Sequence, residues 1–136
     1  MSQRHHVLVV DDEPGIRNLL VRALERLSCD CDEAEDGVRA LEMLAVVKFD
    51  VVVTDLRMPH LQGTTLVSAL LNHDERPAII VMTGMLDPQE MRRLKKCEIE
   101  GFFAKPFNPE SMAQEVKAIA DRRQRLWLHQ GALSHK

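Results

Sequence analysis

A basic excess, a long apolar run and a metal-binding cysteine pattern are all missing from this sequence. The 136 residues carry a net charge of −3, whereas nucleic-acid-binding modules usually carry a basic excess on one face. No apolar stretch approaches the roughly 18 residues that a membrane span needs. The segment Met1–His6 is polar, unlike the apolar part of a secretory signal. We therefore expect a cytoplasmic location and no direct binding to nucleic acid or membrane.

The cysteines and histidines are too dispersed to predict a zinc site. Cys29 and Cys31 lie two residues apart, with no second pair and no nearby histidine, and Cys97 is far along the chain. This is poor spacing for zinc. The six histidines form no His-Glu-x-x-His pattern. We interpret the cysteines as small buried side chains.

Short apolar runs alternate with helical patterns along the chain. The strands are predicted at Val7–Val10, Cys29–Ala34, Val51–Thr54, Ala78–Thr83 and Gly101–Ala104. The helices are predicted after Pro14, at Gly37–Val47, at Thr64–Leu71, after the cap Asp87 and after the cap Asn108. Five strand–helix units in a row predict an α/β fold, a parallel sheet with helices on both of its faces.

Helical spacing predicts which side chains face the core. In the first helix these are Ile16, Leu19, Leu20, Ala23, Leu24 and Leu27, and in the second Ala40, Leu41 and Leu44. After about Arg123 the sequence is basic and reads as irregular. We therefore predict one domain at residues 1–125, followed by a C-terminal tail or the start of a linker at 126–136.

Four of the predicted strands carry a short motif at the carboxyl end that includes at least one polar side chain. They are Asp11, Asp12 and Glu13 after the first strand, Asp55 after the third, Thr83 and Gly84 at the fourth, and Lys105 and Pro106 after the fifth. Ligands of open α/β sheets bind at this edge. Carboxylates within roughly 4 Å repel by about 4 kcal/mol per pair at an effective dielectric near 20, so the cluster favours a cation, and hard oxygen ligands suit Mg²⁺. An amine and a hydroxyl beside the metal suit a phosphoryl group, which one carboxylate could accept as an acyl phosphate.

The residues Asp11-Asp12, Asp55-Leu56-Arg57-Met58-Pro59, Thr83-Gly84 and Lys105-Pro106 resemble the motif set of response-regulator receiver domains. The resemblance covers roughly residues 6 to 123. It implies a flavodoxin-like fold, a doubly wound five-stranded parallel sheet of order 2-1-3-4-5 with five helices.

The resemblance also implies a role for each residue of the site. Asp55 resembles the phospho-acceptor, Thr83 the hydroxyl that follows the phosphate, and Lys105 the amine that pairs with it. Asp12 resembles the residue that binds Mg²⁺ directly, Asp11 its partner acting through water, and the backbone carbonyl of Arg57 the third metal ligand. The bond between Lys105 and Pro106 is expected to be cis.

Two further roles concern the signal. Phe102 resembles an aromatic switch, although Phe102 and Phe103 alternate across a strand, so one of them must face outward and need only pack on a helix. Arg57 and Met85 occupy the positions that tune how long the phosphate lasts in this family, and both are bulky here.

The implied function is that of a two-component receiver rather than an enzyme, with no chemistry beyond self-phosphorylation from small donors and self-dephosphorylation. Its implied partners are a sensor histidine kinase or a phosphotransfer protein, and an unknown downstream protein or effector domain. The downstream protein or effector domain would be signalled through the surface of the fourth helix, fifth strand and fifth helix. A phosphorylation-dependent homodimer is also compatible with that surface.

Three other functions compete with this interpretation. A haloacid-dehalogenase-type phosphatase normally needs a second Asp two residues after its nucleophile, where this chain has Arg57, which is no proton donor at neutral pH. A flavin-binding electron carrier would need a hydroxyl- and glycine-rich phosphate loop, where this chain has Asp11-Asp12-Glu13. A degenerate receiver acting only as an interaction module would be expected to lack a site residue, and none is missing.

Overall fold

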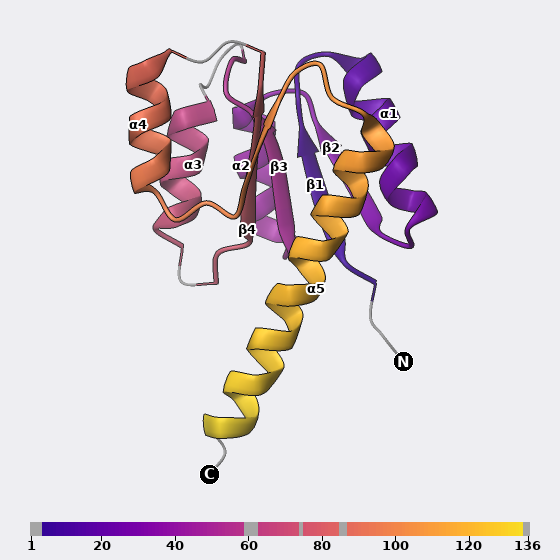
Figure 1. Ribbon diagram of the computed structural model, residues 1–136, viewed down its shortest axis with the longest axis vertical. Coiled ribbons are helices and arrows are strands. Elements are labelled where there is room, and N and C mark those ends of the chain that lie inside the picture. Colours follow the sequence, from indigo (N-terminus) through magenta and orange to yellow (C-terminus); the bar gives the residue numbers. More distant parts are fainter. Residues whose placement is uncertain (1–3, 59–62, 74, 85–86, 135–136) are drawn as a thin grey trace.

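The protein is a five-stranded parallel sheet with helices on both faces (Figure 1). The computed structural model describes residues 4–58, 63–73, 75–84 and 87–134. The strands are β1 (His6–Val10), β2 (Asp30–Ala34), β3 (Val51–Asp55), β4 (Ala78–Thr83) and β5 (Gly101–Ala104). Their order across the sheet is β2-β1-β3-β4-β5, and every neighbouring pair is parallel, as predicted.

Burial explains why the strands differ in sequence. Every residue of β3 and β4 is buried, and four of the five residues of β1 are buried. These three central strands are covered on both faces, so they are built largely from Val, Ile and Leu. The edge strands β2 and β5 have one neighbour each and keep exposed residues.

Five helices cover the sheet and divide the core in two. They are α1 (Pro14–Arg26), α2 (Gly37–Val46), α3 (Gly63–Leu71), α4 (Pro88–Lys96) and α5 (Pro109–Ser134). Val7 and Val9 of β1 pack with side chains of α1 and α5, whereas Leu8 and Val10 pack with side chains of α2, α3 and α4. Because alternate strand residues point to opposite faces, each central strand serves both cores.

The predicted helix caps are confirmed. The Asp87 carboxylate accepts hydrogen bonds from the backbone N–H of Gln89 at 2.6 Å and of Glu90 at 3.2 Å, which fixes where α4 begins. The Asn108 side chain accepts from the backbone N–H of Ser111 at 2.9 Å at the start of α5. Each cap stands in the connection that follows the carboxyl end of a strand, β4 for α4 and β5 for α5.

Three sequence predictions are wrong in detail. Leu19 is 57% exposed and Leu41 is 36% exposed, although both were expected to face the core. A helix lying on a sheet buries only a narrow stripe, so a residue adjacent in sequence to Leu20 or Ala40 is turned away by about 100°. The chain after Arg123 was expected to be irregular but continues as helix to Ser134. No helix within the described residues combines the length and apolar character that crossing a membrane requires.

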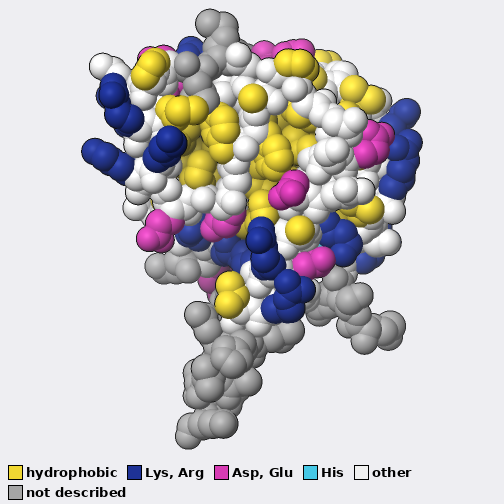
Figure 2. Space-filling view, viewed as in Figure 1, with side chains coloured by type: hydrophobic (Ala, Val, Ile, Leu, Met, Phe, Trp, Pro, Cys, Tyr) yellow, Lys and Arg dark blue, Asp and Glu magenta, His cyan; other side chains and the backbone are white. Residues whose placement is uncertain are grey.

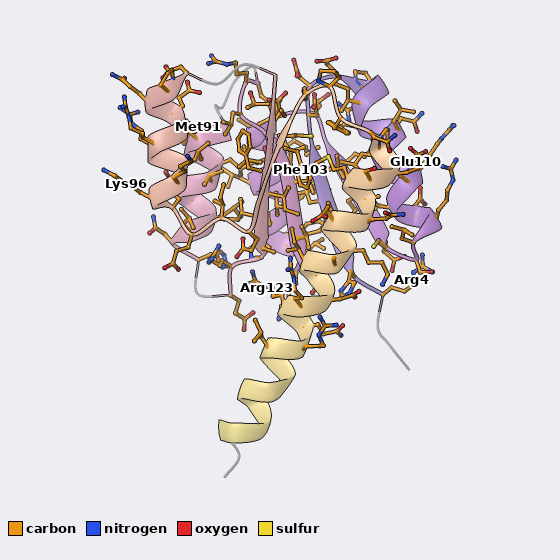
Figure 3. The ribbon with its side chains drawn as sticks, in the orientation of Figure 1. Arg4, Met91, Lys96, Phe103, Glu110 and Arg123 are labelled. Atoms are coloured by element: carbon orange, nitrogen blue, oxygen red, sulfur yellow. The ribbon has the colours of Figure 1, made fainter. Side chains whose placement is uncertain are left out.

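Side chains at the amino end of the sheet anchor α5. His5 Nε2 lies 2.6 Å from Asp121 Oδ1, and Lys117 Nζ donates to Asp121 Oδ2 at 2.9 Å. The hydrogen bond from His5, followed by that from Lys117, lowers the pKa of Asp121 below its usual value. Further along the helix, Arg123 contacts Glu100 at 3.5 Å and also donates to the backbone carbonyl of Arg76. Figure 3 shows Arg123 where α5 passes the lower end of the sheet, beyond which the helix projects from the body.

We expect Asp121→Asn to have a thermal midpoint a few degrees below that of the wild type at pH 7. In acid, the two midpoints should become nearly equal. The folded-state pKa of Asp121 is below the unfolded one, so its carboxylate stabilises the fold above the unfolded pKa, and this contribution is lost as pH falls through the folded pKa. Below that pH the wild-type side chain is protonated and differs little from the amide. Thermal melts from about pH 2 to pH 7 measure the difference.

The matched control is Glu115→Gln, which neutralises an exposed acid of α5 that forms no ion pair within the described residues. Its midpoint should track that of the wild type. A constant gap between Asp121→Asn and wild type across the whole pH range would contradict the assignment.

Candidate functional site

The carboxyl ends of β1, β3 and β5 bring two acids and one amine into direct contact. Lys105 Nζ donates to Asp11 Oδ2 and to Asp55 Oδ2, both at 2.7 Å. Asp11 is fully buried and Asp55 is 5% exposed. Asp11 and Asp55 leave the sheet at the same level, because they follow the paired residues Val10 and Thr54. Lys105 lies two residues further along, since Thr54 pairs with Val81 whereas Ala104 pairs with Thr83, and its long side chain reaches both acids.

Backbone hydrogen bonds hold both carboxylates in place. Asp11 Oδ1 accepts from the backbone N–H of Glu13 at 2.9 Å, and Asp55 Oδ1 accepts from that of Arg57 at 3.0 Å. Each acid therefore uses one oxygen to close its own loop and turns the other toward Lys105. The backbone N–H of Lys105 donates to the carbonyl of Thr83 at 2.9 Å. The bond between Lys105 and Pro106 is cis, as the resemblance implied.

Burial and hydrogen bonding act in opposite directions on the pKa values of Asp11 and Lys105. Burial raises the pKa of Asp11 above its usual value, even though its hydrogen bonds with Lys105 and the Glu13 backbone act in the opposite direction. Burial alone would lower the pKa of Lys105, but its hydrogen bonds to Asp11 and Asp55 outweigh that effect and raise it. Lys105 is therefore a firmly protonated cation, and it is the common partner of two acids.

The third acid, Asp12, gives the cluster an open side. Carboxylate oxygens of Asp11, Asp12 and Asp55 lie within 4.8 Å of one another, and Asp12 is exposed while the other two are buried. This spread is close to the roughly 4 Å between opposite ligands of one octahedral Mg²⁺ ion. Carboxylate oxygens are the ligands that such a hard cation prefers. The pocket could therefore hold a metal at the edge of the sheet.

The remaining predicted residues lie on β4 and β5. Thr83 is buried at the end of β4, between β3 and β5. Gly84 follows it, and a side chain there would begin 3.6 Å from Lys105 Cβ, so the ends of β4 and β5 approach closely. Met85 and Pro59 lie outside the described residues.

The two aromatic residues of β5 point to opposite sides. Phe102 is 37% exposed, whereas Phe103 is partly buried and packs on the core shared by α1 and α5. The expectation that one of them faces outward is confirmed. Figure 2 shows hydrophobic side chains at the surface between α5 and the side of the molecule where Figure 1 places α4, which is rich in Lys and Arg.

Sequence reasoning missed one contact of the site. The side chain of Arg57 turns toward α4, where its Nη2 lies 3.3 Å from Glu90 Oε1. No local signal could have shown the pairing, because 33 residues separate the two side chains.

Comparisons with known proteins agree on one family. The sequence profile described as "Response regulator receiver domain" matches residues 7–117. The chain is 34% identical over 113 residues to chemotaxis protein CheY of Halobacterium salinarum, covering 83% of this chain and 94% of that protein. It is 33% identical over 122 residues to transcriptional regulatory protein SrrA of Staphylococcus aureus, covering 88% of this chain but only 49% of SrrA.

Solved structures show the same fold. Chemotaxis response regulator CheY4 of Vibrio cholerae superposes with a TM-score of 0.78 at 28% identity, covering 86% of this chain and 99% of that one. A CheY-like response regulator receiver domain protein from Methanospirillum hungatei superposes with a TM-score of 0.84 at 20% identity, covering 90% of this chain and 98% of that one. At that identity the second match bears on the fold alone.

Without divalent cations, we expect Asp12→Ala to raise the thermal midpoint by a few degrees, because it removes one of three mutually repelling carboxylates. Mg²⁺ should raise the midpoint of the wild type by binding the folded state. It should bind Asp12→Ala at least about tenfold more weakly. Calorimetric melts with and without a chelator, together with Mg²⁺ titrations, measure both effects.

Glu13→Ala is the control for this experiment. It removes a neighbouring exposed acid that lies 3.9 Å from Lys105 Nζ but outside the three-oxygen cluster, so its Mg²⁺ affinity should stay close to wild type. Equal Mg²⁺ affinity in wild type and Asp12→Ala would show that Asp12 is not a ligand.

Proposed function

The chain belongs to the response regulator receiver domain family, and on that premise we propose that it accepts a phosphoryl group on Asp55. The observation that carries the proposal is the position of the Asp55 carboxylate. It lies at the end of β3, 5% exposed, with one oxygen 2.7 Å from Lys105 Nζ and the acids Asp11 and Asp12 beside it. Asp11 contacts the same amine but is fully buried, whereas Asp55 keeps a small exposed fraction.

The transfer itself needs little beyond positioning and charge. An oxygen of the ionised Asp55 carboxylate forms a bond to phosphorus while the bond from phosphorus to the donor breaks. The leaving group keeps the electron pair of that bond, and it is a histidine nitrogen of a kinase or phosphotransfer protein, or the carboxylate of a small acyl phosphate. Lys105, already hydrogen-bonded to Asp55, compensates part of the charge on the phosphoryl oxygens.

Mg²⁺ is the proposed cofactor. Asp11, Asp12, Asp55 and the backbone carbonyl of Arg57 would hold it, and its charge would offset both the repulsion among the acids and the charge of the phosphoryl group. The donor set supports this assignment, since the clustered side-chain ligands are all carboxylates. The role of the chain's own residues is to hold these oxygens together.

Thr83 and Phe102 are the proposed switch. A phosphoryl group adds about two negative charges and three acceptor oxygens, and the Thr83 hydroxyl would move to donate to one of them. This motion would free space for Phe102, which lies exposed on the neighbouring strand β5, to turn inward. To move the equilibrium between the inactive and active conformations from 1:99 to 99:1, the phosphoryl group must favour the active one by about 5.5 kcal/mol. A charge-assisted contact and a new hydrogen bond, each about 1.5–3 kcal/mol, come close to that figure.

The surface of α4, β5 and α5 would then signal a downstream protein or effector domain. Exposed hydrophobic side chains between α4 and α5 support this choice of surface (Figure 2). The cognate histidine kinase or phosphotransfer protein, a phosphorylation-dependent homodimer, a cytoplasmic location and the division at residue 125 stay predictions. Arg57 and Met85 are proposed to set the lifetime of the acyl phosphate.

Treatment with acetyl phosphate and Mg²⁺ is expected to add one phosphoryl group to the wild type and none to Asp55→Asn. The amide cannot act as the nucleophile and changes the shape of the site very little. Intact mass spectrometry measures the addition. Asp36→Asn, which replaces the capping acid of α2, is the matched control and should be modified as fully as the wild type. An undiminished mass increase in Asp55→Asn would place the acceptor elsewhere.

Thr83→Ala should accept the phosphoryl group but switch poorly, because the residue that follows the phosphate has lost its donor. NMR spectra with and without beryllofluoride measure the response of Phe102 and of α4. Shifts as large as those of the wild type would show that Thr83 does not couple the site to this surface.

A further inference from the structure

One ion pair links the loop that follows the proposed acceptor directly to α4. Arg57 Nη2 lies 3.3 Å from Glu90 Oε1 and 3.5 Å from Glu90 Oε2. Glu90 stands in the first turn of α4, where its backbone N–H donates to the capping Asp87. The contact therefore joins the site to the beginning of the helix whose surface would carry the signal.

The other end of Arg57 touches the acceptor itself. Its backbone N–H donates to Asp55 Oδ1 at 3.0 Å, so the guanidinium extends from a residue already bonded to the carboxylate. The Arg57 side chain is 51% exposed and that of Glu90 is 25% exposed. Exposed ion pairs contribute little stability, so a stronger anion close by can take the guanidinium.

Phosphorylation would place such an anion beside Arg57. A phosphoryl group carries about two negative charges and three acceptor oxygens, whereas Glu90 offers one charge. A guanidinium matches phosphate in two parallel hydrogen bonds, which strengthens this preference. The two anions compete for one cation, and the cation cannot serve both fully.

We propose that Glu90 is a positioning residue, whose ion pair with Arg57 keeps the guanidinium away from the phosphorylation site. The phosphoryl group on Asp55 then binds Arg57 in place of Glu90, and the first turn of α4 loses this contact. This inference rests on the proposed function. It adds a second connection from the site to α4, separate from Thr83 and Phe102. Glu90 then opposes phosphoryl binding in the resting protein, and its loss of Arg57 is part of the change at α4.

A double-mutant cycle tests the competition. Beryllofluoride affinity in the presence of Mg²⁺ and the decay rate of the acyl phosphate are measured in wild type, Glu90→Gln, Arg57→Gln and the double variant. Glu90→Gln removes the ion pair with Arg57, so beryllofluoride should bind about two- to fivefold more tightly, in line with the strength of an exposed ion pair. The acyl phosphate should also decay more slowly, since Arg57 stays over it.

The Arg57→Gln background separates this role from a merely structural one. Glu90→Gln also removes a favourable charge from the first turn of α4, and that effect persists when Arg57 is absent. We expect Glu90→Gln to leave beryllofluoride affinity and decay unchanged in the Arg57→Gln background. Glu42→Gln breaks a comparable exposed ion pair with Arg39 on α2, 3.2 Å long, and should leave both quantities at their wild-type values.

Each result decides between distinct conclusions. If Glu90→Gln acts equally in both backgrounds, or not at all, Glu90 does not work through Arg57 and the inference is overturned. If the wild type itself takes up neither a phosphoryl group nor beryllofluoride, the proposed function fails, and this inference with it. Tighter binding that requires Arg57 supports both.

Discussion

The contact of one amine with two buried carboxylates is the interaction on which the rest of the site depends. Lys105 follows β5 and donates to Asp11 after β1 and to Asp55 at the end of β3, both at 2.7 Å. The ends of these three strands must therefore keep their relative positions for the contact to form. Burying two acids without that cation would be strongly unfavourable. The parallel sheet, its strand order and the turn around Lys105 can all be understood as what holds these three groups together.

The three clustered carboxylates lower the stability of the fold, and they are also the groups that could bind a metal. Asp12 adds a third carboxylate that Lys105 does not neutralise, and Asp11 stays buried although burial raises its pKa. Carboxylates this close repel one another, so a cation placed among them would stabilise the site. Under the proposed function, the repulsion that is relieved on binding would contribute to the change of conformation.

The side-chain contacts at the two ends of the sheet differ. At the amino end, His5 and Lys117 fix Asp121, while Arg123 ties α5 to Glu100. At the carboxyl end, the loops carry the acids, and the contact between Arg57 and Glu90 is partly exposed and easily exchanged.

The sequence by itself determined the order of strands and helices, the caps at Asp87 and Asn108, and the residues that meet at the carboxyl edge. These follow from local periodicity and from the rule that parallel strands end at one edge. Only the tertiary structure decided that Asp11 is buried while the adjacent Asp12 is exposed, that Leu19 and Leu41 face outward, and that α5 continues to Ser134. The ion pair between Arg57 and Glu90 was also visible only in the tertiary structure. Burial and long-range charge contacts depend on which helices and strands pack together, and local sequence patterns do not contain that information.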